Sequence, residues 1–397
     1  MDLNVQRVES LLLIAAIVAI AARRLRLPYT VGLVLAGVAL AAFPNFAGLT
    51  LTRDLVFTVL LPPLIFEAAF QMDWSELRGD LPVTLTMASV GVVIAAGLTA
   101  AGAHYLVGWE WPPAVLLGVL ISATDPVSVI AAFKEAGVQG RLRMLVEAES
   151  LFNDGTAAVA FTVALALAVG TKLTPLGITV TFMTTFFGGI VCGGAIGWAL
   201  LRAVGHTQDH LVEITLSTIA AYGSFLVAER FGMSGVMATL TAGIVFGNYG
   251  SGKAISVRGQ TELLSFWEYA AFVANSLVFL LIGLRLTHQN FAAVWVQLAG
   301  IIGIVLLSRA AAVYGCCLPF SRGALRVEPR HQHILVWGGL RGALALALVF
   351  ALPAELPRRE TLITVVFGVV AFSVLVQGLT VPWLLKRSGV VGPPPTA

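Results

Sequence analysis

Long apolar segments separated by short polar loops fill almost the whole chain. Each segment is near the roughly 20 residues that an α-helix needs to cross a hydrocarbon core about 30 Å thick. The pattern predicts about thirteen membrane-spanning helices. The predicted spans cover residues 8–22, 28–43, 54–70, 81–106, 112–133, 143–169, 175–203, 209–230, 233–249, 263–285, 291–318, 332–352 and 361–385. We therefore expect an all-α polytopic membrane protein with one domain over residues 1–397.

Two of these spans contain residues that interrupt helices. The fifth span holds Thr124-Asp125-Pro126, and proline removes a backbone donor and frees a carbonyl one turn earlier. The twelfth span holds Gly338-Gly339-Leu340-Arg341-Gly342 in an apolar run. Paired interruptions in the two halves of a membrane protein are typical of inverted repeats with crossed, broken helices and a site at the midplane. The pattern predicts repeats over about 8–169 and 209–385, linked by the helix at 175–203.

Composition and charge support a membrane setting and add an orientation. Hydrophobic residues make up 58% of the chain and charged residues 11%, and the mean hydropathy is +0.91. One set of alternate loops carries 15 of the 24 Lys and Arg residues, and the opposite set carries 7. The richer set is Arg23, Arg24, Arg26, Arg78, Lys134, Arg141, Arg143, Arg202, Lys253, Arg258, Arg322, Arg326, Arg330, Lys386 and Arg387. The positive-inside rule then predicts a cytoplasmic C-terminus and an outside N-terminus.

Three acids lie within apolar sequence in the fifth and sixth spans. They are Asp125, Glu149 and Asp154. Burying an ionised carboxylate at membrane depth costs several kcal/mol unless it is paired, solvated or neutralised. Intramembrane acids of this kind indicate an ion path, here for a cation that exchanges with protons.

Helical spacing sorts the polar residues of the sixth span into two stripes. Ser150 and Asp154 are four residues apart and share one stripe, and Glu149 and Asn153 share the next. We expect Arg341 to pair with Glu149 as a structural clasp. A small alkali cation prefers several hard oxygen ligands. We expect these ligands to come from Asp154, Asp125, the Ser150 hydroxyl and carbonyls freed near Thr124.

Other polar residues give weaker signals. Glu67 follows a double proline, and the sequence leaves open whether it bonds Asn153 or faces a cytoplasmic funnel. Arg285 and Arg309 are expected to reach the interface from helix ends.

No cofactor is expected, since the six His and three Cys show no zinc or CxxC spacing. Residues 247–254 nearly match a phosphate-binding loop, but Ala254 replaces the required Ser or Thr, so no nucleotide is expected, nor any nucleic acid.

Four motifs in order resemble the monovalent cation:proton antiporters, specifically the NhaP-type sodium/proton exchangers. They are Leu61-Pro62-Pro63-Leu64-Ile65-Phe66-Glu67, Ser122-Ala123-Thr124-Asp125-Pro126-Val127, the run from Glu149 to Gly155, and Gly339-Leu340-Arg341-Gly342. The resemblance covers nearly the whole chain. It implies an antiporter, not an enzyme, that exchanges Na⁺, and also Li⁺, for H⁺ across a plasma membrane.

The resemblance also implies roles for these residues. Asp154 would bind a cation or a proton in turn, with Asp125, Ser150 and the Thr124 carbonyl in the cation shell. Glu149 and Arg341 would form the supporting ion pair. Asn153 in front of the aspartate implies electroneutral one-for-one exchange. A homodimer is implied, in which a core bundle of about 81–169 and 291–385 moves against a dimerisation domain formed by the remainder.

Alternatives remain at this stage. Selectivity depends on ligand placement that the sequence does not give, so a K⁺/H⁺ antiporter of the same architecture stays open. A passive channel would require a continuous polar path, which the apolar flanks do not provide. An intramembrane aspartyl protease using Asp125 and Asp154 would leave Arg341 and the broken helices without a role.

Overall fold

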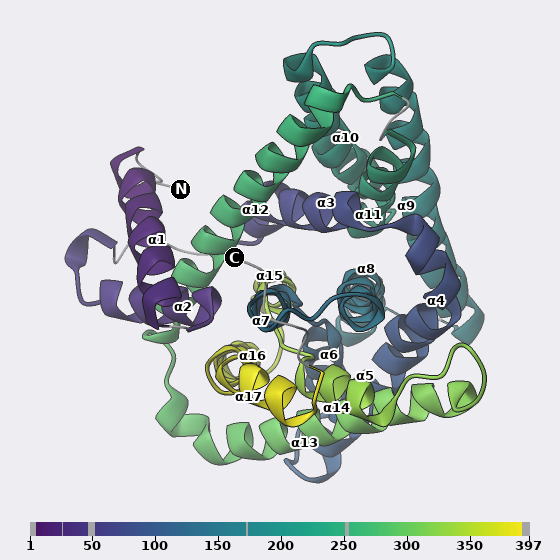
Figure 1. The fold of residues 1–397 in the computed structure, drawn as a ribbon. Coiled ribbons are helices and arrows are strands. Elements are labelled where there is room, and N and C mark those ends of the chain that lie inside the picture. Colours follow the sequence, from purple (N-terminus) through teal and green to yellow (C-terminus); the bar gives the residue numbers. More distant parts are fainter. Residues whose placement is uncertain (1–4, 26, 47–51, 172–173, 251–253, 391–397) are drawn as a thin grey trace. The chain divides into compact units, whose positions relative to one another are not determined.

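Helices form nearly every part of the chain that the structure describes, and no β-strand occurs there (Figure 1). The computed structural model describes residues 5–25, 27–46, 52–171, 174–250 and 254–390. Arg26, Lys172 and Lys253 of the charge count, and residues 251–253 of the loop with the phosphate-binding pattern, lie outside these ranges. The predicted all-α class is confirmed for the described residues.

Seventeen α-helices, labelled as in Figure 1, occur in the described residues. The α-helices of the first half are α1 Val5–Leu25, α2 Tyr29–Leu40, α3 Leu61–Gln71, α4 Trp74–Thr86, α5 Val92–Tyr105, α6 Trp111–Ser122, α7 Val127–Ala136, α8 Arg141–Ala168 and α9 Pro175–Val204. Those of the second half are α10 His210–Arg230, α11 Gly235–Val245, α12 Val257–Leu286, α13 Phe291–Cys317, α14 Pro329–Trp337, α15 Ala343–Phe350, α16 Arg359–Phe372 and α17 Gly378–Arg387. Short 3₁₀ or π segments are η1 Pro44–Phe46, η2 Leu55–Leu60, η3 Met87–Gly91, η4 Phe246–Gly250, η5 Leu318–Phe320 and η6 Ser373–Gln377.

Eight helical segments of the described chain are long and apolar enough to cross a membrane. Two shorter apolar helices, Tyr29–Leu40 and Leu55–Gln71, join them. All thirteen predicted ranges contain helix. The α14–α15 pair is not among these eight, because the break at residues 338–342 divides it into two short helices.

Two helices begin earlier than their hydropathy indicates. The fourth span was expected from residue 81, but α4 begins at Trp74, where Asp73 Oδ1 accepts the Ser75 N–H at 2.7 Å. The tenth was expected from residue 263, but α12 begins at Val257. Both extra turns are polar, so an apolar window omits them although a capped polar turn continues the helix.

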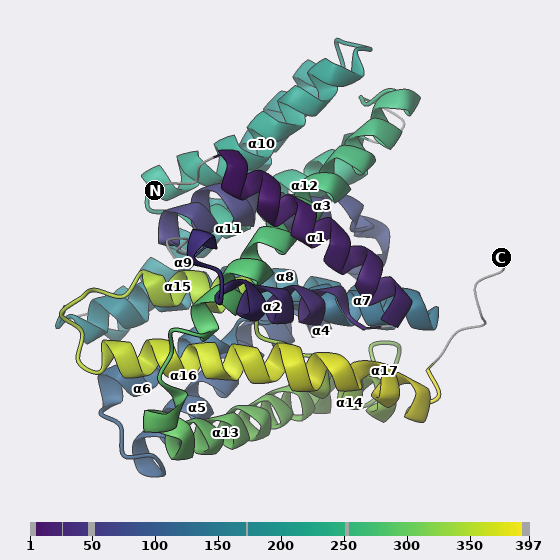
Figure 2. The same cartoon turned by 90° about the vertical axis from the view of Figure 1, so that its left-hand side faces the viewer.

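The chain divides into two compact units, each built from separated stretches of sequence. The first comprises residues 1–53, 82–153 and 276–397, and the second comprises 54–81 and 154–275. In the first unit, α13 packs against α5 and α16, and Figure 2 shows α13 and α16 running alongside each other. Gly37 of α2 meets Gly283 of α12 so closely that an added Cβ on Gly37 would lie 2.2 Å from the Leu280 carbonyl oxygen.

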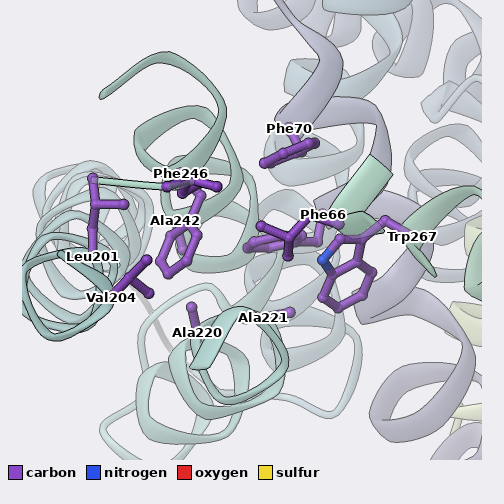
Figure 3. Packing of buried hydrophobic residues seen from close by; sticks show 11 residues of the cluster. Phe66, Phe70, Leu201, Val204, Ala220, Ala221, Ala242, Phe246 and Trp267 are labelled. Atoms are coloured by element: carbon purple, nitrogen blue, oxygen red, sulfur yellow. The ribbon is translucent and has the colours of Figure 1, made fainter. Parts of the chain in front are cut away.

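The second unit has a core rich in aromatic residues, formed by residues of α3, α9, α10, α11, η4 and α12 (Figure 3). The rings of Phe66 and Trp267 lie 4.5 Å apart, and the Trp267 indole N–H donates to Ser217. Helices α9 and α11 pack through small residues. A Cβ on Gly193 would lie 2.0 Å from the Ala238 carbonyl oxygen, so glycine permits the backbones to touch.

Candidate functional site

The predicted break in the fifth span is confirmed. Helix α6 ends at Ser122 with Ala123 extended, and α7 begins at Val127. Proline cannot donate a backbone hydrogen bond, and it disfavours the helical conformation for the residue before it. Asp125 lies just before the new helix, and its Oδ1 accepts the N–H of the first helical residue, Val127, at 2.9 Å. Its carboxylate therefore lies at the N-terminal end of α7, where the helix dipole favours negative charge.

The predicted break in the twelfth span is confirmed as well, and the two breaks are in contact. The Asp125 N–H donates to the Leu340 carbonyl at 2.7 Å. A Cβ added to Gly342 would lie 2.0 Å from Asp125 Oδ2, so only glycine allows this approach. The interrupted segments thus satisfy each other's backbone and place the Asp125 carboxylate beside residue 342.

Asn153 of α8 connects the sixth span to the break of the fifth. Its Nδ2 donates to Thr124 Oγ1 at 2.6 Å and to Glu149 Oε1 at 2.9 Å, and its Oδ1 accepts the Thr124 N–H at 3.2 Å. The hydroxyls of Ser150 and Thr124 are 3.1 Å apart. All four side chains are buried. The structure therefore brings together Thr124, Glu149, Ser150 and Asn153.

The predicted pairing of Glu149 with Arg341 is wrong. Glu149 pairs with Arg309 of α13, whose Nη1 and Nη2 donate to the two carboxylate oxygens at 2.8 and 2.9 Å. Arg309 Nη2 also donates to the Leu335 carbonyl. The expectation that Arg309 reaches the interface is also wrong, since Arg309 is only 7% exposed. A planar guanidinium fits a carboxylate with two parallel hydrogen bonds, and these charge-assisted bonds are stronger than bonds between neutral groups.

Arg341 instead folds back on its own break. Its Nη1 donates to the Gly339 carbonyl at 2.9 Å, and its backbone N–H donates to Ser373 Oγ at 2.9 Å. Among the described residues, no carboxylate oxygen lies within 4.0 Å of the Arg341 guanidinium. The physical reason is that Arg309 already occupies both oxygens of Glu149.

A polar brace on the thirteenth predicted span was missed in the sequence. Ser373 Oγ donates to Gln377 Oε1 at 2.7 Å, and Gln377 Nε2 donates to the Trp337 carbonyl at 3.1 Å. Both residues belong to the π-helix η6. The brace joins the end of α14 to the Arg341 backbone across the break. Ser373 and Gln377 in an otherwise apolar run were the available signal.

Asp154 and Glu67 belong to the second unit. Asp154 follows Asn153 directly in α8 and is half-buried. Glu67 lies on α3, and its Oε1 accepts a hydrogen bond from Gln71. The transport roles of both acids stay predictions.

Residues 11–387 match the family model described as "Sodium/hydrogen exchanger, transmembrane". The chain belongs to this sodium/hydrogen exchanger family. It is 38% identical over 370 residues to the Na⁺/H⁺ antiporter ApNhaP of Aphanothece halophytica, covering 92% of this chain and 71% of that protein. It is 33% identical to the Na⁺/H⁺ antiporter NhaH of Halobacillus aidingensis, with 96% of each chain covered.

A solved structure shares the fold. The sodium proton antiporter MjNhaP1 from Methanocaldococcus jannaschii matches with a TM-score of 0.76 at 18% identity, over 98% of each chain. The predicted resemblance to NhaP-type antiporters is thereby confirmed, and the family consists of transporters and not enzymes.

Proposed function

We propose that this protein is a secondary active antiporter that exchanges Na⁺ for H⁺ across a membrane. The relatives at 38% and 33% identity are Na⁺/H⁺ antiporters, and their similarity extends over nearly the whole chain. The observation that carries the proposal is the polar network of Thr124, Ser150 and Asn153 at a helix break in apolar surroundings. Irregular backbone at membrane depth is tolerated where it serves a cavity or a site.

Asp154 is the residue for which Na⁺ and H⁺ compete. It follows Asn153 by one residue and Ser150 by one helical turn along α8, and this spacing supports its role. Asp125, the Ser150 hydroxyl and Thr124 complete the oxygen shell of the transported cation. A carboxylate that binds a cation or a proton, but not both, couples the movements of the two ions.

Exchange is electroneutral, with one Na⁺ for one H⁺. Asn153 uses both of its N–H groups as donors, to Thr124 and Glu149, so it occupies the network as a neutral amide. Glu149 is held by Arg309 and takes no part in ion binding. The single exchanging carboxylate then binds one Na⁺ on the way in one direction and one H⁺ on the way in the other, so no net charge crosses the membrane.

Transport proceeds by alternating access between two inverted repeats. The repeats cover about 8–169 and 209–385, with the helix at 175–203 as the link. A core bundle of about 81–169 and 291–385 moves against a dimerisation domain formed by the remainder. The contact between the breaks of the fifth and twelfth spans, one from each repeat, supports this arrangement.

The protein works as a homodimer in the plasma membrane, with its N-terminus outside and its C-terminus in the cytoplasm. The excess of Lys and Arg in one set of loops supports this orientation. Glu67 serves as an accessory acid on α3.

Vesicle flux tests the proposal. Purified protein is reconstituted, and internal pH is followed after Na⁺, Li⁺ or K⁺ is added, with voltage clamped by a permeant ion. We expect proton movement with Na⁺ and Li⁺ that the clamp does not change. A response to K⁺ alone would identify a K⁺/H⁺ antiporter, and no response to any cation would reject antiport.

The matched variants are Asp154→Asn and Glu355→Gln. Asp154→Asn removes the charge and keeps the volume, so exchange should be lost while the fold remains. Glu355 is exposed in the loop before α16, so its variant should exchange at the wild-type rate. Wild-type flux in Asp154→Asn would reject the role of Asp154.

A further inference from the structure

A small cavity in the first unit lies between α13, α16 and the break of the twelfth span. It is lined by Arg309, Gly339, Arg341 and Gln377, and by the apolar residues Ile302, Val305, Leu306, Val369 and Phe372. Its volume is about 10 Å³. A cavity of this size is large enough for a single small ligand, such as one water molecule or one monatomic ion.

Two guanidinium groups face this cavity with unused donors. A guanidinium has five N–H donors and no acceptor. In the Arg341 guanidinium one nitrogen, Nη1, donates to the backbone carbonyl of Gly339, and Nε is buried without an acceptor. In Arg309 both terminal nitrogens bind acceptors, but the buried Nε has no partner. Arg341 is 3% exposed and Arg309 is 7% exposed.

The buried charges around the cavity do not balance. Among the described residues of this unit, the buried charged side chains are Arg309, Arg341 and Glu149. Two guanidinium groups thus face one carboxylate. Asp125 is half-buried, its Oδ1 accepts the Val127 N–H, and it forms no ion pair with Arg341 within 4.0 Å.

An uncompensated buried charge is costly, and apolar walls cannot compensate it. The cavity offers donors of positive charge and aliphatic or aromatic surface, so its chemistry excludes a cation. Its small volume favours a monatomic ion over a polyatomic anion such as phosphate. A halide ion fits, because it accepts several N–H bonds at once and supplies the missing negative charge.

We propose that this cavity binds one halide-sized monovalent anion, with chloride as the physiological ligand, held by Arg341 and the Arg309 Nε. The anion completes the arginine pair that faces Glu149 and stabilises the break of the twelfth span. This anion is a resident ligand and is not exchanged, so the inference does not depend on which cation the protein transports.

Thermal unfolding of the purified full-length chain tests the inference. Chloride replaces gluconate at constant sodium concentration and pH, and bromide replaces chloride in a second series. We expect the melting temperature to rise with halide concentration and to saturate, by on the order of a few degrees Celsius. A melting temperature that does not depend on the anion would overturn the proposal.

Two neighbouring leucines provide matched variants. Leu306 lines the cavity, whereas Leu307 is 74% exposed. Leu306→Phe fills the cavity and should abolish the halide-dependent rise, and Leu307→Phe should retain it. An equal halide response in both variants would assign the effect to general salt and overturn the site.

Diffraction by the wild-type protein keeps the inference testable if Leu306→Phe does not fold. Crystals grown in bromide should show an anomalous scattering peak between Arg309 and Arg341. Density in the cavity without anomalous signal would show that water satisfies the guanidinium donors, and the proposal would then be wrong.

Discussion

The pair of Glu149 with Arg309 is the strongest test of the site at the scale of single residues. Arg309→Met removes the cation and leaves Glu149 buried without its partner. Breaking a buried pair in this way costs about 3–5 kcal/mol of the free energy of unfolding. Chemical unfolding of the purified protein should show this loss.

A surface arginine and a double variant serve as controls. Arg322 is exposed, and Arg322→Met should leave stability within about 0.5 kcal/mol of wild type. Adding Glu149→Gln to Arg309→Met removes the uncompensated charge and should restore part of the stability. If Arg309→Met alone were as stable as Arg322→Met, the pair would have no structural role.

Asn153 gives a second prediction at this scale. Asn153→Asp keeps the shape but replaces the two donor bonds to Thr124 and Glu149 with a carboxylate beside Glu149. Each lost buried hydrogen bond lowers the free energy of unfolding by about 1–3 kcal/mol, and repulsion between the two carboxylates lowers it further. We expect lower stability at neutral pH and partial recovery in acid, because protonation of one carboxyl restores a donor and removes the repulsion.

The control for this prediction is Asn290→Asp. Asn290 caps α13 through its Oδ1, which accepts the Ala293 N–H, and an aspartate can make the same bond. Its stability should stay near wild type at both pH values. Asn153→Asp with no pH-dependent loss would show that the amide donors are dispensable.

At this scale, sequence reasoning brought Thr124 and Ser150 together from different spans, and it was most direct for neighbours along one helix. Spacing by four residues placed Asn153 beside Glu149, and the structure joins them. The partner of Glu149 depends on how α13 packs, and nothing local distinguishes Arg309 from a snorkelling arginine near a helix end. The hydrogen bond from the Arg341 guanidinium to the Gly339 carbonyl likewise follows from the geometry of the break, which a sequence does not give.

At the scale of elements, the contact between the two helix breaks is the feature to test. Gly342→Ala places a Cβ 2.0 Å from Asp125 Oδ2, so the break or the carboxylate must move. We expect Na⁺-dependent exchange in vesicles to fall by at least about tenfold, since small misplacements at a site have effects of this order. Gly315→Ala is the control, because nothing lies within 4 Å of its added Cβ. Equal exchange by the two variants would contradict the role of the contact.

The packing of α9 on α11 gives a further prediction for elements. Gly193→Ala places a Cβ 2.0 Å from the Ala238 carbonyl oxygen, whereas the same change at Gly194 meets its nearest atom at 3.7 Å. Overpacking of this kind lowers the free energy of unfolding by about 1–3 kcal/mol. Thermal unfolding should show a lower melting temperature for Gly193→Ala than for Gly194→Ala. A higher melting temperature for Gly193→Ala than for Gly194→Ala would show that α9 and α11 can move apart without loss of stability.

The breaks could be predicted from sequence because proline and glycine act on their own backbone. The polar first turns of α4 and α12 could not, because a hydropathy window registers only apolar residues. The π-helix η6 was missed for another reason. Its polar residues Ser373 and Gln377 satisfy groups on a different segment, and that partnership becomes visible only in the folded chain.

At the scale of the whole molecule, hydropathy gave the helical ranges but not their grouping. The first unit combines residues 1–53, 82–153 and 276–397, so segments far apart in sequence share one core. The match to MjNhaP1 at 18% identity and a TM-score of 0.76 shows that this fold persists although most residues differ. Any nonpolar residue of suitable size fills a lipid-facing or core position, whereas the residues at the breaks are constrained by contact.

The last prediction concerns the pH dependence of transport by the whole protein. If Na⁺ and H⁺ compete for the Asp154 carboxylate, protonation reduces the fraction of sites that can bind Na⁺ and leaves the bound site unchanged. Mass action then raises the half-saturating Na⁺ concentration as pH falls, by about tenfold per pH unit once the site is mostly protonated. The maximal rate at saturating Na⁺ should stay constant. Flux at graded Na⁺ concentrations and several equal inside and outside pH values measures both quantities. A constant half-saturating concentration with a falling maximal rate would place the proton on a separate group and reject competition at a single carboxylate.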